Sequence, residues 1–373
     1  MRILQICSAR ELGGGEKHLA DLANALARRG HDVHAALIPA SPLLGELSAL
    51  PTQNILELAM RNSLNARSAL KLVRFVRENQ IEIIHAHVAR DYPLAALVAA
   101  RAGGVPVVLT RHVLFPLKKV HRLTLRRVAR VIAVSQAVAD GLRGQRIFDE
   151  RKIVVIHNGI DLEKFSREGN DRVAAQAKAR GNQNRLQVGA IGHIAPIKGH
   201  DDFIRAAAIV NSQRDDVDFI IAGEDKSRTG DHRRQIEELI DDLGLGERVR
   251  LSGWVNDVAQ LLSTLDLFVS SARSEPFGLA IVEAMAAGVP VVATRSEGAR
   301  EIIDADTTGK LVPIGDVEAL AKAICELLAD PTERANLSAN ARRAVSERFS
   351  LEQMVDATEQ LYRQVLSESA TTA

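Results

Sequence analysis

The sequence predicts an α/β protein with two parallel-sheet domains, and three observations support this. The chain has 373 residues, which is enough for two domains of ordinary size. Residues 2–38 show the order strand, glycine-rich loop, amphipathic helix and strand, and residues 267–293 repeat the order strand, helix and strand. Units of this kind build parallel sheets with helices packed on their faces.

The first half of the chain alternates short apolar runs with helical patterns. Leu19, Leu22 and Leu26 share one face of a helix predicted over residues 16–29, and Gly30 ends that helix. A second helix is predicted over residues 63–79. The predicted strands are residues 2–7, 32–38, 81–86, 105–110, 131–134 and 153–156.

A polar stretch separates this half from a second series of elements. Residues 166–184 carry no strand pattern and are interpreted as a linker, so the predicted domains are residues 1–165 and 185–350. The predicted strands of the second domain are residues 186–191, 218–222, 249–252, 267–269 and 289–293. The predicted helices that accompany them are residues 231–243, 257–264, 279–287, 316–328, 333–347 and 351–366.

The composition is ordinary for a globular protein of the cytoplasm. Hydrophobic residues make up 46% and charged residues 25% of the chain. No stretch approaches the ~18 apolar residues of a membrane span, and the N-terminus shows no signal-peptide pattern. The only cysteines are Cys7 and Cys325, without a CxxC motif, which indicates a reducing cytosol and no structural zinc.

Charge is divided unevenly between the two halves. Residues 1–165 carry 24 Lys and Arg against 14 Asp and Glu, a net charge of +10, and the remainder nets −9. This asymmetry indicates an anionic partner for the first half. Aromatic residues make up only 3% of the chain, which argues against a base-stacking surface and hence against nucleic acid. An anionic lipid surface or a phosphorylated glycolipid fits better.

Residues 270–301 carry the strongest functional signal. A polar turn ends at Gly278, and the predicted helix that follows is apolar apart from Glu283. Free backbone N–H groups around Gly278 and Leu279 suit a phosphate, and a carboxylate one turn further on can accept hydrogen bonds from a ribose diol. A buried glutamate is costly unless it is paired or hydrogen-bonded. The stretch predicts a nucleotide site; alternatively, Glu283 pairs with an arginine and Glu275 is solvated.

Glu275 and Glu283, followed by the run EAMAAGVPVVAT, resemble the signature of retaining GT-B glycosyltransferases of family 4. The resemblance extends, less strongly, over nearly the whole chain. It implies two Rossmann-like parallel-sheet domains facing a central cleft, with the C-terminal helix, residues 351–373, crossing back to the first domain. It also implies that Glu275 lies near the donor sugar hydroxyls and that Glu283 holds the ribose. In this family the diphosphate is held by backbone amides, here those of Phe277, Gly278 and Leu279.

The loop before the first predicted helix ends in Gly13, Gly14 and Gly15. A glycine loop at a helix start is a candidate anion site. It lacks the GxGxxG spacing and an acidic residue after the next strand, which argues against a nicotinamide cofactor. The resemblance implies that Gly14 and Gly15 approach the donor phosphate and that Gly13 approaches the acceptor. A plain tight turn is the alternative.

Two histidines follow strands of the first domain. Ligands of parallel sheets meet residues just past the C-terminal ends of strands, where both His87 and His112 lie. The family places a histidine near the transferred sugar after the strand that matches residues 107–110, which favours His112. Either histidine can instead be structural. Arg111 either binds an acceptor phosphate or caps the strand end.

The second domain opens with a strand and a loop that contains Lys198. A lysine before a helix can stabilise a departing diphosphate by its charge, although a solvated lysine is the alternative. The family usually has arginine where His193 stands, and a histidine is charged only when its pKa is raised. We expect this departure from the family pattern either to weaken the binding of the donor or to change which donor is used. The resemblance also implies that the loop around Val255 lines the nucleobase, where Trp254 either stacks or belongs to the core.

Residues 118–130 carry six Lys and Arg and no acidic residue. Val120, Leu123, Val128 and Val131 give the stretch an approximate helical stripe, which predicts a basic interfacial helix that meets anionic lipid. A buried helix with a solvated basic face is the alternative.

The resemblance implies a retaining hexosyltransferase that moves a sugar from a nucleotide-sugar donor to a glycan or glycolipid acceptor. Lipopolysaccharide or another cell-envelope glycan, made at the cytoplasmic membrane face, is the expected product. His112, Lys198 and Glu275 are the expected catalytic residues, and neither a cofactor nor a metal is expected. Asp304 and Asp306 imitate a DxD metal motif but are interpreted as unrelated to one. A nucleotide-sugar epimerase and a degenerate glycan-binding protein are the alternatives.

Overall fold

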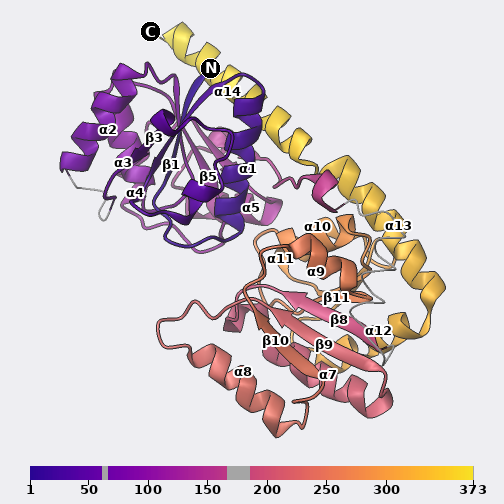
Figure 1. Ribbon diagram of the computed structural model, residues 1–373. Helices are drawn as coiled ribbons and strands as arrows, with labels where there is room; N and C mark the ends of the chain where they lie inside the picture. Colours follow the sequence, from indigo (N-terminus) through magenta and orange to yellow (C-terminus); the bar gives the residue numbers. More distant parts are fainter. Residues whose placement is uncertain (61–65, 166–184, 373) are drawn as a thin grey trace. The chain divides into compact units, whose positions relative to one another are not determined.

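The computed structural model describes residues 1–60, 66–165 and 185–372, and it divides into two compact units (Figure 1). Unit 1 comprises Met1–Gly159 together with Leu351–Ala373, and unit 2 comprises Ile160–Ser350. Each unit contains one sheet in which all paired strands are parallel. The predicted α/β class with two Rossmann-like parallel-sheet domains is confirmed. The predicted linker, residues 166–184, lies outside the described residues.

Unit 1 is organised around a seven-stranded sheet in the order β3-β2-β1-β4-β5-β6-β7. The strands β2 and β3 are added on one side of β1 and the strands from β4 onward on its other side, so the strand order reverses at the β1/β4 boundary. Ligands of such sheets bind at this switch point. The strands are β1 (Arg2–Cys7), β2 (Asp32–Leu37), β3 (Ile55–Glu57), β4 (Ile83–Ala86), β5 (Val107–Arg111), β6 (Arg130–Ala133) and β7 (Ile153–Val155).

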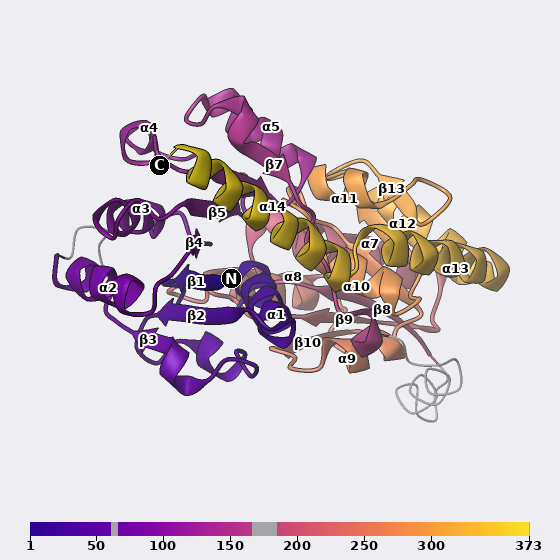
Figure 2. The same cartoon turned by 90° about the horizontal axis from the view of Figure 1, so that it is seen from above.

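Helices of unit 1 complete its core. Leu19, Leu22 and Leu26 of the first helix are fully buried, as the periodicity predicts. The C-terminal helix packs beside that helix, where Tyr362 and Val365 enter the same core (Figures 1 and 2). The last helix therefore crosses back to the first domain, as the resemblance implies. The helices of unit 1 are α1 (Gly14–Arg28), α2 (Ala66–Glu78), α3 (Tyr92–Arg101), α4 (His121–Thr124), α5 (Gln136–Gln145) and α14 (Leu351–Thr372).

Unit 2 repeats the plan with a six-stranded sheet in the order β10-β9-β8-β11-β12-β13. The strands are β8 (Leu186–Ile191), β9 (Val217–Ala222), β10 (Val249–Gly253), β11 (Leu267–Ser270), β12 (Val291–Thr294) and β13 (Lys310–Val312). The helices are α7 (His200–Gln213), α8 (Asp231–Asp242), α9 (Val258–Thr264), α10 (Leu279–Ala286), α11 (Glu297–Ile302), α12 (Val317–Ala329) and α13 (Pro331–Arg348). Its switch point is the β8/β11 boundary.

The prediction of one amphipathic helix over residues 118–130 is wrong. Only a single turn, α4, is helical, and Arg130 already pairs with Val108 as the first residue of β6. Val128 is fully buried, whereas Leu123 is 81% exposed, so the apolar residues of this segment do not share one face. Sheet pairing and burial on the core side override the weak local helical pattern.

Among the described residues, no helix combines the length and the apolar character that a membrane crossing requires.

Candidate functional site

Three segments of unit 1 meet at the C-terminal edge of its sheet. His87 follows β4, His112 follows β5, and the glycine loop leads from β1 into α1. Because β1, β4 and β5 are neighbours, the turns that follow them converge. A Cβ atom on Gly15 would lie 3.2 Å from Cγ of His112, so the glycine loop is in close contact with that imidazole. The structure thus brings together residues that the sequence predicts separately.

The helix start at this edge is formed by the predicted acceptor and donor glycines. Gly13 is the N-cap of α1 in an extended conformation, and its carbonyl accepts a hydrogen bond from Lys17 N (3.0 Å). Gly14 is exposed at the first helical position, so its backbone is accessible to a ligand. These contacts fit the anion site that the sequence predicts.

His112 belongs to a buried group of histidines. Its ring centroid lies 4.9 Å from that of His18 and 5.8 Å from that of His87. Burial lowers the pKa of His18 to about 4 and holds the pKa of His85, His87 and His112 well below the usual range, with smaller effects from the neighbouring rings. These imidazoles are therefore neutral near pH 7. No sequence pattern singles out His18, which lies on the buried face of α1.

This group makes the stability of unit 1 sensitive to acid. A histidine whose pKa is lowered on folding binds its proton better in the unfolded chain, so stability is complete above pH 6.5 and is lost as the pH falls toward the folded-state pKa. Each such histidine contributes a slope of about 1.4 kcal/mol per pH unit in that window. We expect urea unfolding followed by circular dichroism to show falling stability from pH 6.5 to 4.5, and a shallower slope for His87→Asn. Equal slopes would contradict this explanation.

Arg111, predicted to bind an acceptor phosphate or to cap a strand, is buried at the end of β5. Its guanidinium donates a hydrogen bond to the carbonyl of Phe115 and also contacts the hydroxyl of Tyr92. Burial raises the pKa of Tyr92, an effect that the nearby guanidinium opposes. These contacts fit the capping alternative more closely than an open phosphate site.

Unit 2 brings its predicted residues together at its own switch point. Lys198 lies in the loop after β8 and Glu275 in the loop after β11, and these strands are adjacent. Lys198 Nζ forms an ion pair with Glu275 Oε2 at 2.5 Å. The two side chains and Gly278 line one small pocket at the carboxyl ends of β8 and β11. The sequence predicts each residue, but not that the two side chains pair.

Backbone contacts fix the position of Lys198. Ser271 Oγ donates a hydrogen bond to the carbonyl of Lys198 (3.0 Å), and Arg273 N donates to the carbonyl of Ile197 (2.9 Å). The next residue, Gly199, has φ +62°, and a Cβ there would lie 2.2 Å from Ser271 O. Only glycine allows this approach of the two loops. The sequence does not indicate Arg273, whose guanidinium also binds Asp201 and Asp202, at 2.7 and 2.8 Å.

The turn into α10 is also shaped by glycines. Gly278 has φ +114° at the N-cap of α10, so it presents the first amides of the helix without a side chain over them. Phe277 beside it is 2% exposed and anchors the turn in the core of unit 2. Glu297, which the sequence analysis missed, accepts hydrogen bonds from Ser274 Oγ (3.1 Å) and Glu275 N (3.3 Å).

A second glycine, Gly298, packs against the backbone of this turn. Its N–H donates to Glu275 O at 2.8 Å, and a Cβ there would lie 1.9 Å from Phe277 O. We expect Gly298→Ala to destabilise unit 2 by about 1–3 kcal/mol, because the backbone of the turn must move. Gly141→Ala is the matched control: it lies in α5 with open space around it and should be neutral or stabilising. Denaturant unfolding measures both; equal effects would contradict the proposed clash.

Glu283 lies on the second turn of α10 and is 5% exposed. The helix around it is otherwise apolar, as the sequence predicts. His193 is half-buried in the loop after β8, and its carbonyl interacts with His200 Nε2 at 3.2 Å. Burial lowers the pKa of His200 to about 4, so this neighbouring histidine is neutral. The basic side chain that this loop contributes to the pocket is that of Lys198.

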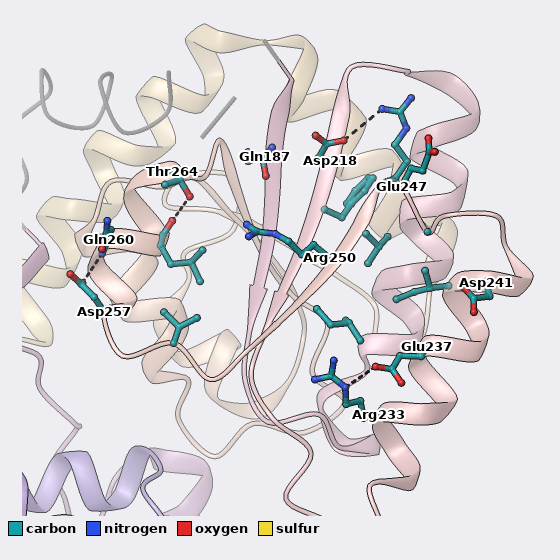
Figure 3. A pocket seen from close by; sticks show the side chains of 18 residues that line it. Gln187, Asp218, Arg233, Glu237, Asp241, Glu247, Arg250, Asp257, Gln260 and Thr264 are labelled. Atoms are coloured by element: carbon teal, nitrogen blue, oxygen red, sulfur yellow. Dashed lines mark hydrogen bonds and ion pairs between the residues drawn. The ribbon is translucent and has the colours of Figure 1, made fainter. Parts of the chain in front are cut away.

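The predicted nucleobase loop lies at the end of β10. Trp254 is 43% exposed, so it is not a core residue; its Nε1 donates to Asn256 Oδ1 (2.8 Å), and Lys226 Nζ lies 5.3 Å from the ring centroid. Val255 lines a wide hollow along β10 between α8 and α9, shown in Figure 3. Lys198 and Glu275 do not line that hollow, so it is separate from the pocket at the switch point.

The residues that imitate a metal motif are engaged in ion pairs. Asp306 Oδ1 pairs with Lys310 Nζ (3.1 Å), and Asp304 Oδ2 lies 3.7 Å from Arg348 Nη1. Both carboxylates lie beyond α11, in the turn that precedes β13. This placement fits the interpretation that they are structural.

Comparisons with known proteins agree with this geometry. Residues 12–164 match the family described as Glycosyltransferase Family 4, and residues 171–344 match the family described as Glycosyl transferases group 1. The chain is 29% identical to the lipopolysaccharide core biosynthesis glycosyltransferase LpsE of Rhizobium meliloti (strain 1021), over 94% of this chain and 95% of that protein. It is 32% identical to the lipopolysaccharide core biosynthesis mannosyltransferase LpcC of Rhizobium leguminosarum bv. viciae, over 66% and 67% of the two chains.

A solved structure shows the same fold at full length. The crystal structure of Anabaena Alr3699/HepE in complex with UDP-glucose matches with a TM-score of 0.84 and 26% identity, over 100% of both chains. Together with the two switch-point sites, these matches show that the chain belongs to the group 1 glycosyl transferases, as a family 4 glycosyltransferase with the GT-B fold.

Proposed function

We propose that the protein transfers a hexose from a nucleotide-sugar to a glycan or glycolipid acceptor with retention of anomeric configuration. The observation that carries this proposal is the pocket in unit 2 that the Lys198–Glu275 pair and the glycine turn at Gly278 line together. Glu283 is buried further along α10, the helix that begins after this turn, and is not one of the residues that line the pocket. HepE, a full-length structural relative, has been crystallised with UDP-glucose, which supports a nucleotide-sugar as the donor.

Each of these residues has a chemical role in the proposal. The amides of Gly278 and Leu279, at the positive end of α10, bind the diphosphate together with Lys198. As the sugar–phosphate bond breaks, negative charge grows on the leaving diphosphate, and these groups stabilise it. Glu283 accepts hydrogen bonds from the ribose hydroxyls, and Glu275 positions the sugar. His193, in the loop after β8, belongs to the same donor site in this proposal. Val255, which the resemblance assigned to the nucleobase, lines the separate hollow along β10 and is left out of it.

The ion pair of Lys198 with Glu275 suggests how the site responds to its donor. The diphosphate competes with Glu275 for the ammonium group of Lys198, since both are anions that the ammonium group can bind at hydrogen-bond distance. Release from Lys198 leaves the Glu275 carboxylate able to accept hydrogen bonds from sugar hydroxyls. Donor binding and sugar positioning are coupled in this way.

For unit 1 we propose the acceptor role. His112, neutral and in contact with Gly15, orients or polarises the reacting centre, while Gly13 belongs to the acceptor side. Arg111 caps the end of β5 and is not part of the proposed acceptor site. No separate base is needed if the departing phosphate takes the proton of the acceptor hydroxyl. The proposed transfer assigns no step to a metal, and the ion pairs of Asp304 and Asp306 support a structural role for the DxD-like residues.

The acceptor class follows from the relatives and from charge. Two relatives are described as lipopolysaccharide core enzymes, which supports cell-envelope glycolipid synthesis for this chain. We place the reaction in the cytoplasm, at the inner face of the plasma membrane.

The proposed membrane contact is the loop of residues 113–127, in place of the helix that the sequence predicted. Its apolar side chains Phe115 and Leu123 are 68% and 81% exposed. Five basic residues surround them and are all exposed: Lys118, Lys119, Arg122, Arg126 and Arg127. Exposed aromatic and aliphatic groups among basic ones suit an anionic lipid surface.

Changing Lys118, Lys119, Arg126 and Arg127 to Glu is expected to release the protein from vesicles that contain anionic phospholipid, because each basic residue near such a surface contributes about 1 kcal/mol. Vesicle co-sedimentation at physiological salt measures this. The matched control carries the same charge change on exposed residues of unit 2: Arg228, Arg234, Lys322 and Arg343. Equal release by the two variants would show that net charge alone is responsible and would remove this loop as the contact.

The test of the proposed function starts from a thermal-shift screen of UDP-, GDP- and ADP-sugars, since a ligand that binds only the native state raises its melting temperature. The donor selected in this way is incubated with and without a glycolipid acceptor, and products are identified by NMR. An α-linked product from an α-linked donor supports the proposal. Inversion at the anomeric carbon would contradict retention, and an isomerised sugar formed without acceptor would indicate an epimerase.

A further inference from the structure

Two histidines beside His112 have no role in the proposed transfer. His18 and His87, together with His112, each place one ring nitrogen within 4.8 Å of the others. We propose that these three imidazoles form a binding site for one divalent transition-metal ion of the zinc type, and that the bound ion inhibits transfer by occupying His112. Metal binding depends on unit 1 alone, whereas inhibition rests on the proposed function.

The geometry requires only small side-chain movements. Zinc binds imidazole nitrogen at about 2.0–2.1 Å, which places nitrogens in a tetrahedral site about 3.4 Å apart. The present upper separation of 4.8 Å therefore has to close by about 1.4 Å. Tilting of the rings can supply this, since the His18 and His112 rings already meet edge to face with centroids 4.9 Å apart.

The ring nitrogens are in the right chemical state for a metal. His87 Nε2 donates a hydrogen bond to Gln5 Oε1 at 2.8 Å, which assigns the proton to Nε2 and leaves the lone pair on Nδ1. Among the described residues, His87 Nδ1 and both ring nitrogens of His112 have no hydrogen-bond partner. Ligating histidines usually donate their other ring N–H to an oxygen acceptor that orients them, and the Gln5 amide oxygen is such an acceptor here.

A fourth histidine nearby shows the contrast. His85 has its ring centroid 4.1 Å from that of His87, but both of its nitrogens are engaged, Nδ1 with Tyr362 (2.5 Å) and Nε2 with Thr110 (2.7 Å). His85 therefore packs against the cluster without offering a ligand. The hydrogen bonds to Tyr362 of α14 and Thr110 of β5 fix the position of the His85 ring, against which the ring of His87 packs.

The site is enclosed and has an open coordination position. His18 and His87 are 3% and 4% exposed, whereas His112 is half-buried, although both of its ring nitrogens are buried. A metal ion therefore reaches the three rings only when the side chains around them move. Three protein nitrogens leave a fourth position for water or a ligand, as in open zinc sites. Three imidazoles without a carboxylate select zinc, cobalt, nickel or copper over the oxygen-preferring Mg²⁺ and Ca²⁺.

Binding is tested by titrating Co²⁺ into the complete protein after removal of bound metal with a chelator. We expect visible ligand-field absorption that saturates at one ion per chain, displaced by Zn²⁺ and unaffected by excess Mg²⁺. His18→Gln and His87→Gln should lose the absorption, whereas His121→Gln, outside the cluster, should keep it. Gln5→Leu should weaken Co²⁺ binding about 10- to 100-fold, because His87 is no longer oriented. Circular dichroism confirms that each variant is folded.

Inhibition is tested separately by adding Zn²⁺ to the transfer assay. We expect loss of activity that a chelator reverses, and at least about tenfold weaker inhibition in His18→Gln, which should keep its activity without metal. Absence of Co²⁺ absorption in the folded wild-type protein, or equal absorption in His18→Gln and His87→Gln, would overturn the metal site. Saturated Co²⁺ binding without inhibition would overturn the inhibitory role and leave the proposed transfer reaction untouched.

Discussion

Replacing Lys198 by Ala is expected to lower kcat for sugar transfer by about 10²- to 10³-fold, the cost of losing one preorganised group that stabilises charge in a transition state. Lys198 is held against Ser271 and the Glu275 carboxylate, so its ammonium group is already in place when the donor binds. The effect should fall mainly on kcat rather than KM, because the diphosphate gains its extra charge only as the bond to the sugar breaks. Steady-state kinetics with saturating donor and acceptor measure it.

A matched lysine in the same unit provides the control. Lys322 is exposed on α12 and pairs with Glu326 at 3.8 Å, which makes it similar in kind to Lys198 without a place at the switch point. Lys322→Ala should leave kcat unchanged. The role given to Lys198 would have to be abandoned if its Ala variant kept wild-type kcat, or if both variants lost activity equally.

The second large effect is expected at Glu283. In the wild-type protein a nucleotide-sugar at 100 times its Kd stabilises the native state by about 2.7 kcal/mol, which raises the melting temperature by about 5–10 °C for a domain of this size. Glu283→Gln should abolish most of that rise, because an amide replaces the carboxylate that we propose accepts two hydrogen bonds from the ribose. Glu283→Ala should abolish it as well, with some loss of intrinsic stability from the cavity left in α10.

Two comparisons separate binding from stability in this experiment. The melting temperature without ligand reports any intrinsic destabilisation, and only the ligand-induced rise reports binding. Glu326→Ala, an exposed glutamate of α12, serves as the control and should show the full rise. A full rise in Glu283→Gln would remove the ribose assignment from this residue.

Much of the site could be predicted from the sequence because both sheets are parallel. In such sheets, ligands meet residues just past the carboxyl ends of strands, so the sequence marks His87 and His112 as candidates. That both lie beside the glycine loop follows only from the strand order of the folded sheet. In unit 2, the strand-to-helix pattern and the family resemblance predict Lys198 and Gly278. Each of these residues follows an apolar run that reads clearly as a strand.

Other features could not be predicted, because they depend on tertiary packing. His18 lies on the inner face of α1 at a position that reads as ordinary core, and only the folded sheet brings it to His112. The pairing of Lys198 with Glu275 joins residues far apart in sequence, and local patterns carry no information on such side-chain contacts. The edge strand β13 has only three residues, too few for a periodic signal.

The basic segment shows how a local pattern misleads. Its apolar residues fit a helical stripe by spacing, but Arg130 is drawn into β6 and Val128 into the core. What remains is an exposed loop that carries Phe115 and Leu123 among basic residues. The sequence predicts the positive charge of this segment correctly, but it does not predict the conformation of the segment.

The most direct test of the donor site is a crystal structure of the complete protein with a hydrolysis-resistant nucleotide-sugar. We predict that the ribose hydroxyls contact the Glu283 carboxylate and that a diphosphate oxygen accepts hydrogen bonds from the amides of Gly278 and Leu279. Lys198 Nζ should lie within hydrogen-bond distance of the same diphosphate. A nucleotide-sugar bound elsewhere, for example in the hollow along β10 that Figure 3 shows, with Glu283 making no contact to it, would contradict the account.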